Sequence, residues 1–214
     1  GEGGFMVPAE GYLPALQEWC TANGIVFIAD EIQSGMARTG KYFASEHFGL
    51  VPDMVLSAKG IAGGLPLAGV TGRAEIMDSA QPGGLGGTFG GNPVSAAAAI
   101  AVFEQIEQKN LLAEAVRIEN ALKGALLELQ KKYPVIGDVR GIGAMIAIEL
   151  VQPGTHEPNA AAVSAISAFA AQKGVLLLTA GTYGNVLRFL PSLAISNELI
   201  AEAVGVIDEA FASL

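Results

Sequence analysis

The sequence predicts an α/β fold in the first part of the chain and a smaller α+β fold in the rest. The apolar runs at residues 25–29 and 54–58 have the length and composition of parallel strands that are covered on both faces. Stretches with helical spacing lie between and beside them, as in an α/β layer architecture. We therefore expect residues 1–100 to form the C-terminal part of a large domain, and residues 101–214 to form a small α+β domain.

Composition and charge exclude several classes of protein. The chain has 214 residues, of which 51% are hydrophobic and 15% are charged, as is typical of a well-packed globular protein. The formal net charge of −9 disfavours broad contact with nucleic acid or with an anionic membrane. No apolar run reaches the roughly 20 residues that span a bilayer, so we expect a cytoplasmic protein. The single cysteine, Cys20, lies among apolar residues in a helical pattern, which predicts a buried structural thiol.

The first elements lead to two polar side chains at strand ends. A helix is predicted over residues 8–23, where apolar side chains recur at helical spacing, and Gly24 is a natural end for it. The first predicted strand then ends at Asp30, the second leads into Lys59, and a third is expected at residues 66–70. Ligands of open α/β sheets bind beyond the carboxyl ends of the strands, where both Asp30 and Lys59 are expected.

A glycine-rich loop at residues 83–91 precedes the last element of the first domain. It ends at Asn92 and Pro93, which favour the cap and the first turn of the alanine-rich helix that follows. We expect this helix to lead out of the domain.

The second domain is predicted to begin with a long amphipathic helix over residues 111–132, followed by a strand near residues 144–150. A further helix comes next, and then two short strands around Leu176 and Leu187. A terminal helix is expected from Asn197. This order of elements indicates a compact α+β domain.

Lys59 is the strongest candidate for a catalytic residue. An amine at the end of an apolar strand can be desolvated, which favours its neutral, nucleophilic form. A lysine beside glycines is otherwise a solvated loop residue. Asp30 strengthens the case, because a carboxylate at a neighbouring strand end could hold the cationic ring nitrogen of a pyridoxal cofactor; alternatively it would cap its own loop. His47 and His156 lack the spacing of metal ligands, and no metal is expected.

Two further sites could bind anions. The backbone N–H groups of residues 86–91 and the Thr88 hydroxyl could bind a phosphate. Arg188 lies among apolar residues, where a guanidinium needs an anionic partner such as a substrate carboxylate; the alternative is an edge-strand arginine in water. Glu2 could pair with such an arginine, although chain ends are often disordered.

Taken together, these motifs resemble the class III aminotransferases of fold type I, over the whole length of the chain. The ordered set of segments is far more specific than any one of them. They are GEGGF at residues 1–5, IADEIQSG at 28–35, RTG at 38–40, SAKGIAGG at 57–64, PLAGV at 66–70, GGTFGGNP at 86–93 and GDVRGIGAM at 137–145. The resemblance implies part of the cofactor-binding large domain of that fold, followed by its C-terminal small domain.

The resemblance also implies roles for the candidate residues around pyridoxal 5′-phosphate. Lys59 would form the Schiff base with the cofactor and then move the substrate proton. Asp30 would hold the pyridinium nitrogen, Ile32 would pack on the ring, and Gln33 would approach the ring hydroxyl. Thr88 would reach the cofactor phosphate of a neighbouring subunit, which implies a homodimer.

The substrates implied by the resemblance are an amino acid and a 2-oxo acid. Arg188 would bind the α-carboxylate of glutamate or 2-oxoglutarate, and Glu2 would neutralise Arg188 when an ω-amino acid occupies the site. The expected reaction is transamination of 4-aminobutyrate to succinate semialdehyde, with 2-oxoglutarate as the amino acceptor. The alternatives are an ornithine or acetylornithine type of aminotransferase, a related aminomutase, or a non-catalytic domain for binding or assembly. Because the family's upstream phosphate loop and ring-stacking aromatic residue do not precede Gly1, we expect a piece of a longer protein with little or no activity alone.

Overall fold

The computed structural model describes all 214 residues, which form two compact units. One unit comprises Pro8–Leu112 and contains Lys59; we call it the lysine unit. The other comprises Gly1–Val7 together with Ala113–Leu214 and contains Arg188; we call it the arginine unit.

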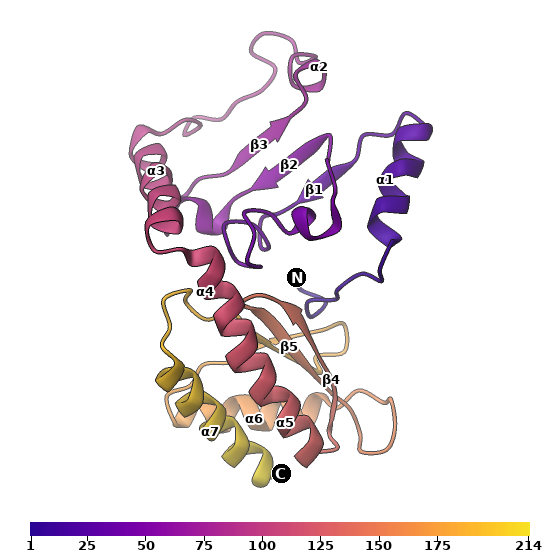
Figure 1. Cartoon of the computed structure of the whole chain (residues 1–214), viewed down its shortest axis with the longest axis vertical. Coiled ribbons are helices and arrows are strands. Elements are labelled where there is room, and N and C mark those ends of the chain that lie inside the picture. Colours follow the sequence, from indigo (N-terminus) through magenta and orange to yellow (C-terminus); the bar gives the residue numbers. More distant parts are fainter. The chain divides into compact units, whose positions relative to one another are not determined.

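The lysine unit is built on a three-stranded sheet with the order β1-β2-β3 (Figure 1). β1 (Ile28–Asp30) is parallel to β2 (Met54–Ser57), and β2 is antiparallel to β3 (Gly69–Gly72). The pairing aligns Asp30 with Leu56, so the carboxyl ends of the two parallel strands lie at the same edge of the sheet. This arrangement confirms the strand ends that the sequence predicts for the two polar residues.

The helical elements of the lysine unit are short, except at its two ends. They are α1 (Tyr12–Ala22), the 3-10 helices η1 (Ala44–Phe48) and η2 (Lys59–Ala62), α2 (Ala74–Met77) and α3 (Pro93–Gln108). Asn92 caps α3 as predicted, because its side-chain oxygen accepts a hydrogen bond from the Val94 N–H at 2.9 Å, and Pro93 occupies the first turn. Cys20 is a buried free thiol, also as predicted.

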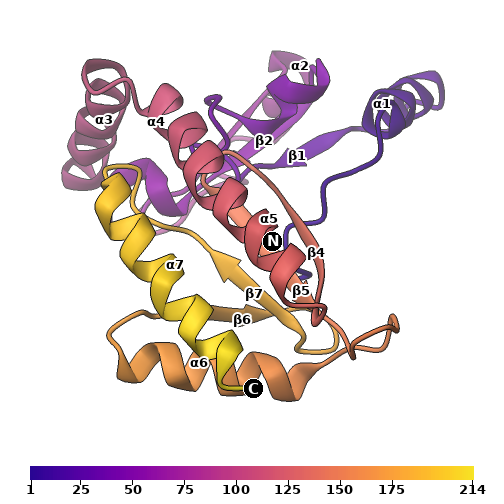
Figure 2. The same cartoon turned by 60° about the horizontal axis from the view of Figure 1, so that its bottom comes forward.

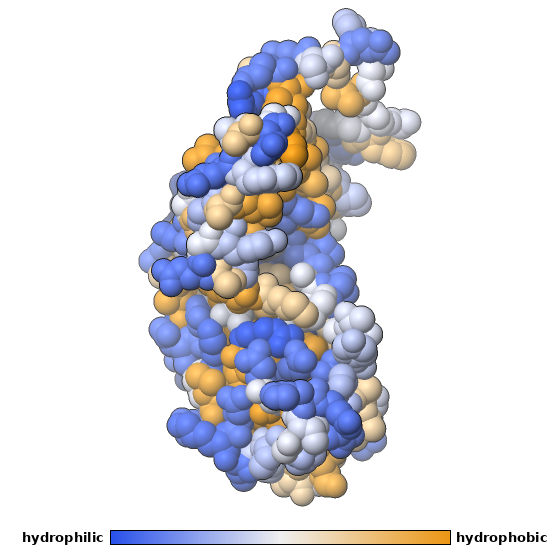
Figure 3. Space-filling view, turned by 90° about the vertical axis from the view of Figure 1, so that its right-hand side faces the viewer, coloured by the Kyte–Doolittle hydropathy of each residue, from blue (hydrophilic) through white to orange (hydrophobic).

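Much of the apolar surface of the lysine unit is open. Ile25, Val26 and Ile28 expose 44, 45 and 49% of their surfaces, so the prediction that residues 25–29 form a strand covered on both faces is wrong for this structure. Apolar strands are buried only where another layer packs on them, and the ordered strand is limited to Ile28–Asp30. Figure 3 shows hydrophobic residues reaching the surface among hydrophilic ones.

The arginine unit contains a four-stranded sheet with the order β4-β5-β7-β6, in which all neighbouring strands are antiparallel (Figure 2). The strands are β4 (Ile136–Ile142), β5 (Met145–Leu150), β6 (Leu178–Ala180) and β7 (Val186–Phe189). β7 therefore lies between β5 and β6 and is not an edge strand.

Helices pack on the sheet of the arginine unit to form its core. They are α4 (Leu111–Ile118), the π-helical turn η3 (Glu119–Lys123), α5 (Gly124–Lys132), α6 (Ala160–Gln172) and α7 (Asn197–Ala212). Side chains of a strand alternate between its two faces. Accordingly, Ile146, Ile148 and Leu150 of β5 join the helical core, whereas Met145 and Ala147 join a second cluster with Phe5 and Val186. The segment Gly1–Val7 therefore covers part of the other face of the sheet.

Most predicted elements of the second half are confirmed in type. The helix expected over residues 111–132 is present as α4, η3 and α5, and β5 occupies most of the strand expected at residues 144–150. β4 was not predicted, because its glycines at 137 and 141 break the apolar alternation of a strand. In the first half, the strand expected at residues 66–70 lies at Gly69–Gly72. The pairing with β2 ends at Ser57 and Gly69, so residues 66–68 lie outside this strand.

Residue 100, after which we expect the boundary between domains, lies inside α3 of the lysine unit. Residues 1–7 belong with the arginine unit. The assignment of two domains stays a prediction. None of the helices is both long enough and apolar enough to cross a membrane.

Candidate functional site

Asp30 and Lys59 lie at the carboxyl ends of neighbouring parallel strands. Asp30 is the last residue of β1, and Lys59 follows β2 directly after Ala58. Both side chains are exposed, and Asp30 Oδ1 accepts a hydrogen bond from the Ile32 N–H at 3.1 Å. The chain thus presents a carboxylate and an amine on the edge of the sheet where α/β folds bind their ligands.

Lys59 has an unusual backbone conformation. Its φ of 48° is left-handed, a region that residues other than glycine rarely adopt and that is often found at functional sites. The left-handed turn starts η2 and ends the extended run of β2. Its exposed side chain differs from the desolvated amine that the apolar strand suggests, because no other residue of this unit covers it.

A buried glutamate shapes the loop that carries Ile32 and Gln33. Glu31 exposes only 4% of its surface, and its carboxylate accepts hydrogen bonds from the Ala44 N–H at 3.0 Å and the Ser45 N–H at 2.7 Å. Buried carboxylates need such partners. The sequence shows only a second acid directly after a strand end, which does not identify this structural role. The structure contains no group of three or more His, Cys, Asp or Glu side chains that could hold a metal.

The glycine-rich loop around Thr88 is fully exposed. Gly83, Gly86 and Gly91 have positive φ angles, which only glycine adopts freely. A Cβ added at Gly86 or Gly87 would meet no atom within 4 Å, so the backbone there is open to a ligand or to another chain. This loop therefore offers backbone N–H groups and a hydroxyl, as the sequence predicts.

Arg188 and Glu2 form an ion pair in the arginine unit. Arg188 Nη1 donates to Glu2 Oε1 at 2.9 Å; the arginine side chain is 9% exposed and the glutamate side chain is 77% exposed. Arg188 Nε is buried and has no hydrogen-bond partner. The alternative of an edge-strand arginine in water is thereby ruled out, because Arg188 lies on the internal strand β7. A buried guanidinium with an accessible anionic partner can exchange that partner for another carboxylate.

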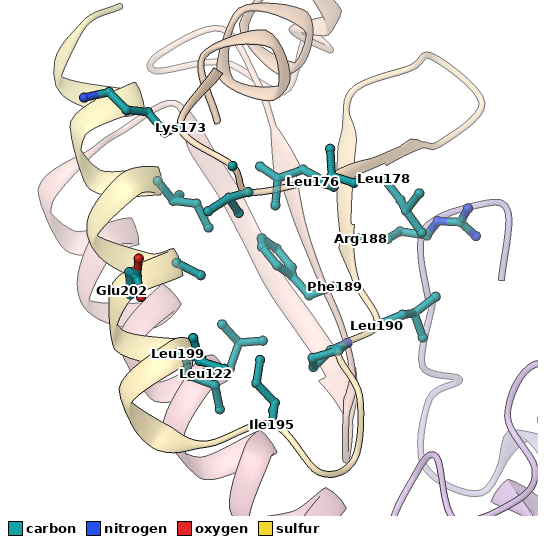
Figure 4. A pocket seen from close by; sticks show the side chains of 17 residues that line it. Leu122, Lys173, Leu176, Leu178, Arg188, Phe189, Leu190, Ile195, Leu199 and Glu202 are labelled. Atoms are coloured by element: carbon teal, nitrogen blue, oxygen red, sulfur yellow. The ribbon is translucent and has the colours of Figure 1, made fainter. Parts of the chain in front are cut away.

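An apolar pocket of about 400 Å³ lies beside Arg188 in the same unit (Figure 4). Its lining consists mainly of aliphatic side chains and Phe189, with Lys173, Arg188 and Glu202 as charged members. Figure 4 shows that the Arg188 guanidinium points away from this pocket and towards the N-terminal segment. The chemistry of the arginine is therefore directed at Glu2 rather than into the pocket.

Comparisons with known proteins decide the family. The family described as Aminotransferase class-III matches residues 1–211. The chain belongs to the class III aminotransferases. This class III chain is 55% identical over 207 residues to a 4-aminobutyrate aminotransferase of Mycobacterium leprae, covering 97% of the chain and 46% of that relative. It is 50% identical to the 5-aminovalerate aminotransferase DavT of Pseudomonas putida, covering 100% of the chain and 50% of that relative.

Solved structures agree with this class III fold. A transaminase from a marine Virgibacillus is 31% identical with a TM-score of 0.93, and the match covers 100% of the chain and 51% of that structure. The ornithine aminotransferase from Toxoplasma gondii is 34% identical with a TM-score of 0.89, covering 100% of the chain and 49% of that structure. The class III chain thus spans about half the length of the relatives it matches.

Class III aminotransferases depend on pyridoxal 5′-phosphate, and the residues of the lysine unit fit this group. The cofactor has an aldehyde, a pyridinium nitrogen and a phosphate. The exposed amine of Lys59 suits the aldehyde, and the exposed carboxylate of Asp30 suits the cationic nitrogen. Ile32 and Gln33 are half-buried on the loop directly after Asp30, on the same strand end.

Proposed function

We propose that the protein carrying this chain transfers the amino group of 4-aminobutyrate to 2-oxoglutarate, giving succinate semialdehyde and glutamate. The observation that carries the proposal is the contact between Arg188 and Glu2. A site for both an ω-amino acid and a 2-oxo diacid needs a cation with two states. The cation must be free to bind the α-carboxylate of the 2-oxo diacid, and a protein group must neutralise it when the ω-amino acid binds. The names of relatives at 50% to 55% identity support 4-aminobutyrate as the amino donor.

The lysine unit would bind the cofactor. Pyridoxal 5′-phosphate, when bound, supplies an electron sink for negative charge at the substrate carbon. In the proposal, the Lys59 amine would hold the cofactor at its aldehyde carbon and would carry the proton that moves at the substrate carbon. Asp30 would hold the protonated ring nitrogen, Ile32 would pack on the ring, and Gln33 would approach the ring hydroxyl.

The arginine unit would distinguish substrates that carry an α-carboxylate from substrates that lack one. 2-Oxoglutarate and glutamate carry an α-carboxylate, which would replace Glu2 on Arg188 in a bidentate contact. An ω-amino acid lacks that carboxylate, and without Glu2 it would leave a buried guanidinium with no counter-ion, which is unfavourable. Glu2 is 77% exposed, so its side chain can turn into water when the carboxylate binds.

A homodimer is part of the proposal. Thr88 lies on an exposed loop whose glycines face open space, which suits a contact with the cofactor phosphate of a second subunit. A cytoplasmic location likewise stays a prediction. The amino donor has one specific competitor, 5-aminovalerate, because a 50% identical relative bears that name.

A substrate panel with the holoenzyme tests the proposal. We expect 4-aminobutyrate and 2-oxoglutarate to yield equal amounts of succinate semialdehyde and glutamate, measured by chromatography. Lys59→Ala should lower turnover by at least about 10³-fold, because covalent binding of the cofactor is lost. The exposed Lys132→Ala is the matched control and should retain turnover. Faster reaction with 5-aminovalerate or ornithine than with 4-aminobutyrate would overturn the choice of donor.

A further inference from the structure

The segment that carries Glu2 is held on the sheet of the arginine unit by backbone contacts. Arg140 Nε donates to the Gly4 carbonyl oxygen at 2.7 Å. The Gly181 N–H donates to the Glu2 carbonyl oxygen at 3.0 Å. Because the Glu2 carboxylate is 77% exposed, water screens its attraction to the buried Arg188 guanidinium. The contact of the exposed Glu2 carboxylate with Arg188 therefore depends on where these two bonds hold its backbone.

Arg140 and Arg188 lie in one row across the sheet. Arg140 of β4 pairs with Ala147 of β5, which pairs with Arg188 of β7. Residues directly opposite each other on neighbouring strands point to the same face. Both arginines therefore lie on the face that Gly1–Val7 covers, with the small, fully buried Ala147 between them.

The two arginines differ in their partners. Arg140 Nη1 donates to Asp138 Oδ2 at 2.8 Å and to Glu149 Oε2 at 2.6 Å, whereas the ion pair of Arg188 is with Glu2. Arg140 is thus neutralised by two carboxylates of its own sheet. Burial lowers the pKa of Arg140, but the hydrogen bonds that it donates to these carboxylates, together with their charges, outweigh burial, and the net pKa is raised. The side chain is only 14% exposed and its orientation is fixed by these bonds.

Gly4 and Phe5 complete the contact. Gly4 has a φ of +99°, and a Cβ there would lie 2.8 Å from Val186 Cγ1 and 2.9 Å from Arg140 Nη2, so only glycine allows this approach. Phe5 is buried, and the Arg188 guanidinium carbon lies 5.4 Å from the centre of its ring, a cation–π distance. The segment that Arg140 holds therefore touches Arg188 through both a carboxylate and an aromatic ring.

We propose that Arg140 is a positioning residue for substrate selection: by binding the Gly4 carbonyl, it holds Glu2 against Arg188 when no α-carboxylate is present. This rests on the proposed function, because it assigns Arg140 an effect on the ω-amino donor alone. Arg140 does not touch substrate. Without it, the segment would shift, and Glu2 would neutralise Arg188 less often. The acceptor, which brings its own carboxylate to Arg188, would be unaffected.

Half-reaction kinetics of the holoenzyme test the proposal. Arg140→Met should lower kcat/KM for 4-aminobutyrate by about tenfold and change kcat/KM for 2-oxoglutarate by less than about twofold. Arg140→Lys keeps a charge between Asp138 and Glu149 but loses the Nε donor. It should therefore retain the thermal midpoint and show the same selective loss. Equal losses in both half-reactions for both variants would overturn the proposal.

Arg117→Met is the matched control. Arg117 also binds a carboxylate, Glu114, at 2.8 Å and the Ile195 carbonyl, but it lies on α4 away from Gly1–Val7. Its loss should affect both half-reactions alike. A selective loss for the donor in Arg117→Met as large as in Arg140→Met would contradict a specific role for Arg140.

A double mutant separates this inference from the proposed function. Glu2→Ala should impair the donor selectively, and adding Arg140→Met should cause no further loss, because both changes break the same contact. Additive losses would overturn the role of Arg140 and leave that of Glu2. If Glu2→Ala has no selective effect, the proposed function fails and the inference fails with it.

Hydrogen exchange gives a readout that does not require activity. In Arg140→Met, the amide hydrogens of peptides covering residues 1–7 and 181–184 should exchange faster, because the Gly181 N–H loses its fixed acceptor on Glu2. Exchange in α7 should be unchanged. Unchanged exchange in residues 1–7 would show that Arg140 does not hold the segment, and would overturn the proposal.

Discussion

The arginine unit and the lysine unit bury their apolar residues very differently. In the arginine unit, 21 buried hydrophobic residues from helices and strands form one cluster. In the lysine unit, the buried hydrophobic residues are few and mostly small: Cys20, Met36, Ala37, Ala62, Ala99 and Ile106. The unit with the carboxylate-binding pair thus has a core of its own, whereas the unit with Lys59 leaves strand residues such as Ile28 and Val70 exposed to water.

This difference in burial affects how firmly each unit holds its functional side chains, Arg188 in one unit and Lys59 in the other. A buried core holds side chains in one arrangement, which suits the ion pair of Arg188. The exposed sheet of the lysine unit offers chemical groups at strand ends but leaves them uncovered. Because the chain spans about half the length of its relatives, we expect additional polypeptide to cover this sheet in the active protein.

The largest expected effect follows from that difference. We expect this 214-residue chain alone to turn over 4-aminobutyrate at least about 10³-fold more slowly than a protein of the length of its relatives, since an exposed Lys59 lacks the dry surroundings that strengthen electrostatic catalysis. Steady-state assays with added pyridoxal 5′-phosphate measure this. Turnover near that of a full-length enzyme would show that the exposed Lys59 is sufficient for catalysis.

A matched pair of isoleucines tests the difference in burial. Ile148 is fully buried in β5, and Ile28 is 49% exposed in β1. Ile148→Ala should lower the free energy of unfolding by about 2–5 kcal/mol through lost burial and a cavity, whereas Ile28→Ala should cost less than about 1 kcal/mol. Denaturant unfolding of the purified chain measures both. Equal losses would mean that the sheet of the lysine unit is covered in solution.

The smallest expected effect concerns a surface charge of the arginine unit. Hydrogen bonds from Lys132 and Tyr133 lower the pKa of Asp208 below its ordinary 3.8. A lowered pKa in the folded state adds stability above about pH 4, and this is lost as the pH falls through the folded value. Asp208→Asn should therefore slightly flatten the acid limb of stability against pH below 4. A large change at neutral pH would show that charge, rather than the core, holds α5 to α7.

The elements that the sequence predicts well depend on local signals. Asn92 and Pro93 specify the start of α3 through contacts within a few residues, and residues 111–132 carry helical periodicity of their own. The burial of residues 25–29 depends instead on what packs over them, which no local pattern contains. The start of β3 likewise depends on its pairing with β2.

The residues of the candidate site also differ in whether a local sequence signal identifies them. Asp30 and Lys59 could be placed because residues that follow apolar parallel strands share one edge of the sheet. Glu31 and Arg140 could not be assigned, because each acts through backbone groups that are distant in sequence: Ser45 for Glu31, and Gly4 for Arg140. The resemblance placed Arg140 in a family signature, but only the contact indicates what it holds.

Both faces of β5 are buried, each against a different part of the arginine unit, and this has a consequence for how class III sequences vary. Ile146, Ile148 and Leu150 face the helical core, whereas Met145 and Ala147 face the segment that carries Glu2. We therefore expect alternate positions of this short strand to be under different selective constraints, one for folding and one for the proposed substrate choice. Among homologues, side-chain size at 146, 148 and 150 should covary with α6 and α7. Size at 145 and 147 should instead covary with residues 4 and 5, so that enzymes changing their amino donor would change odd positions of β5 and conserve even ones.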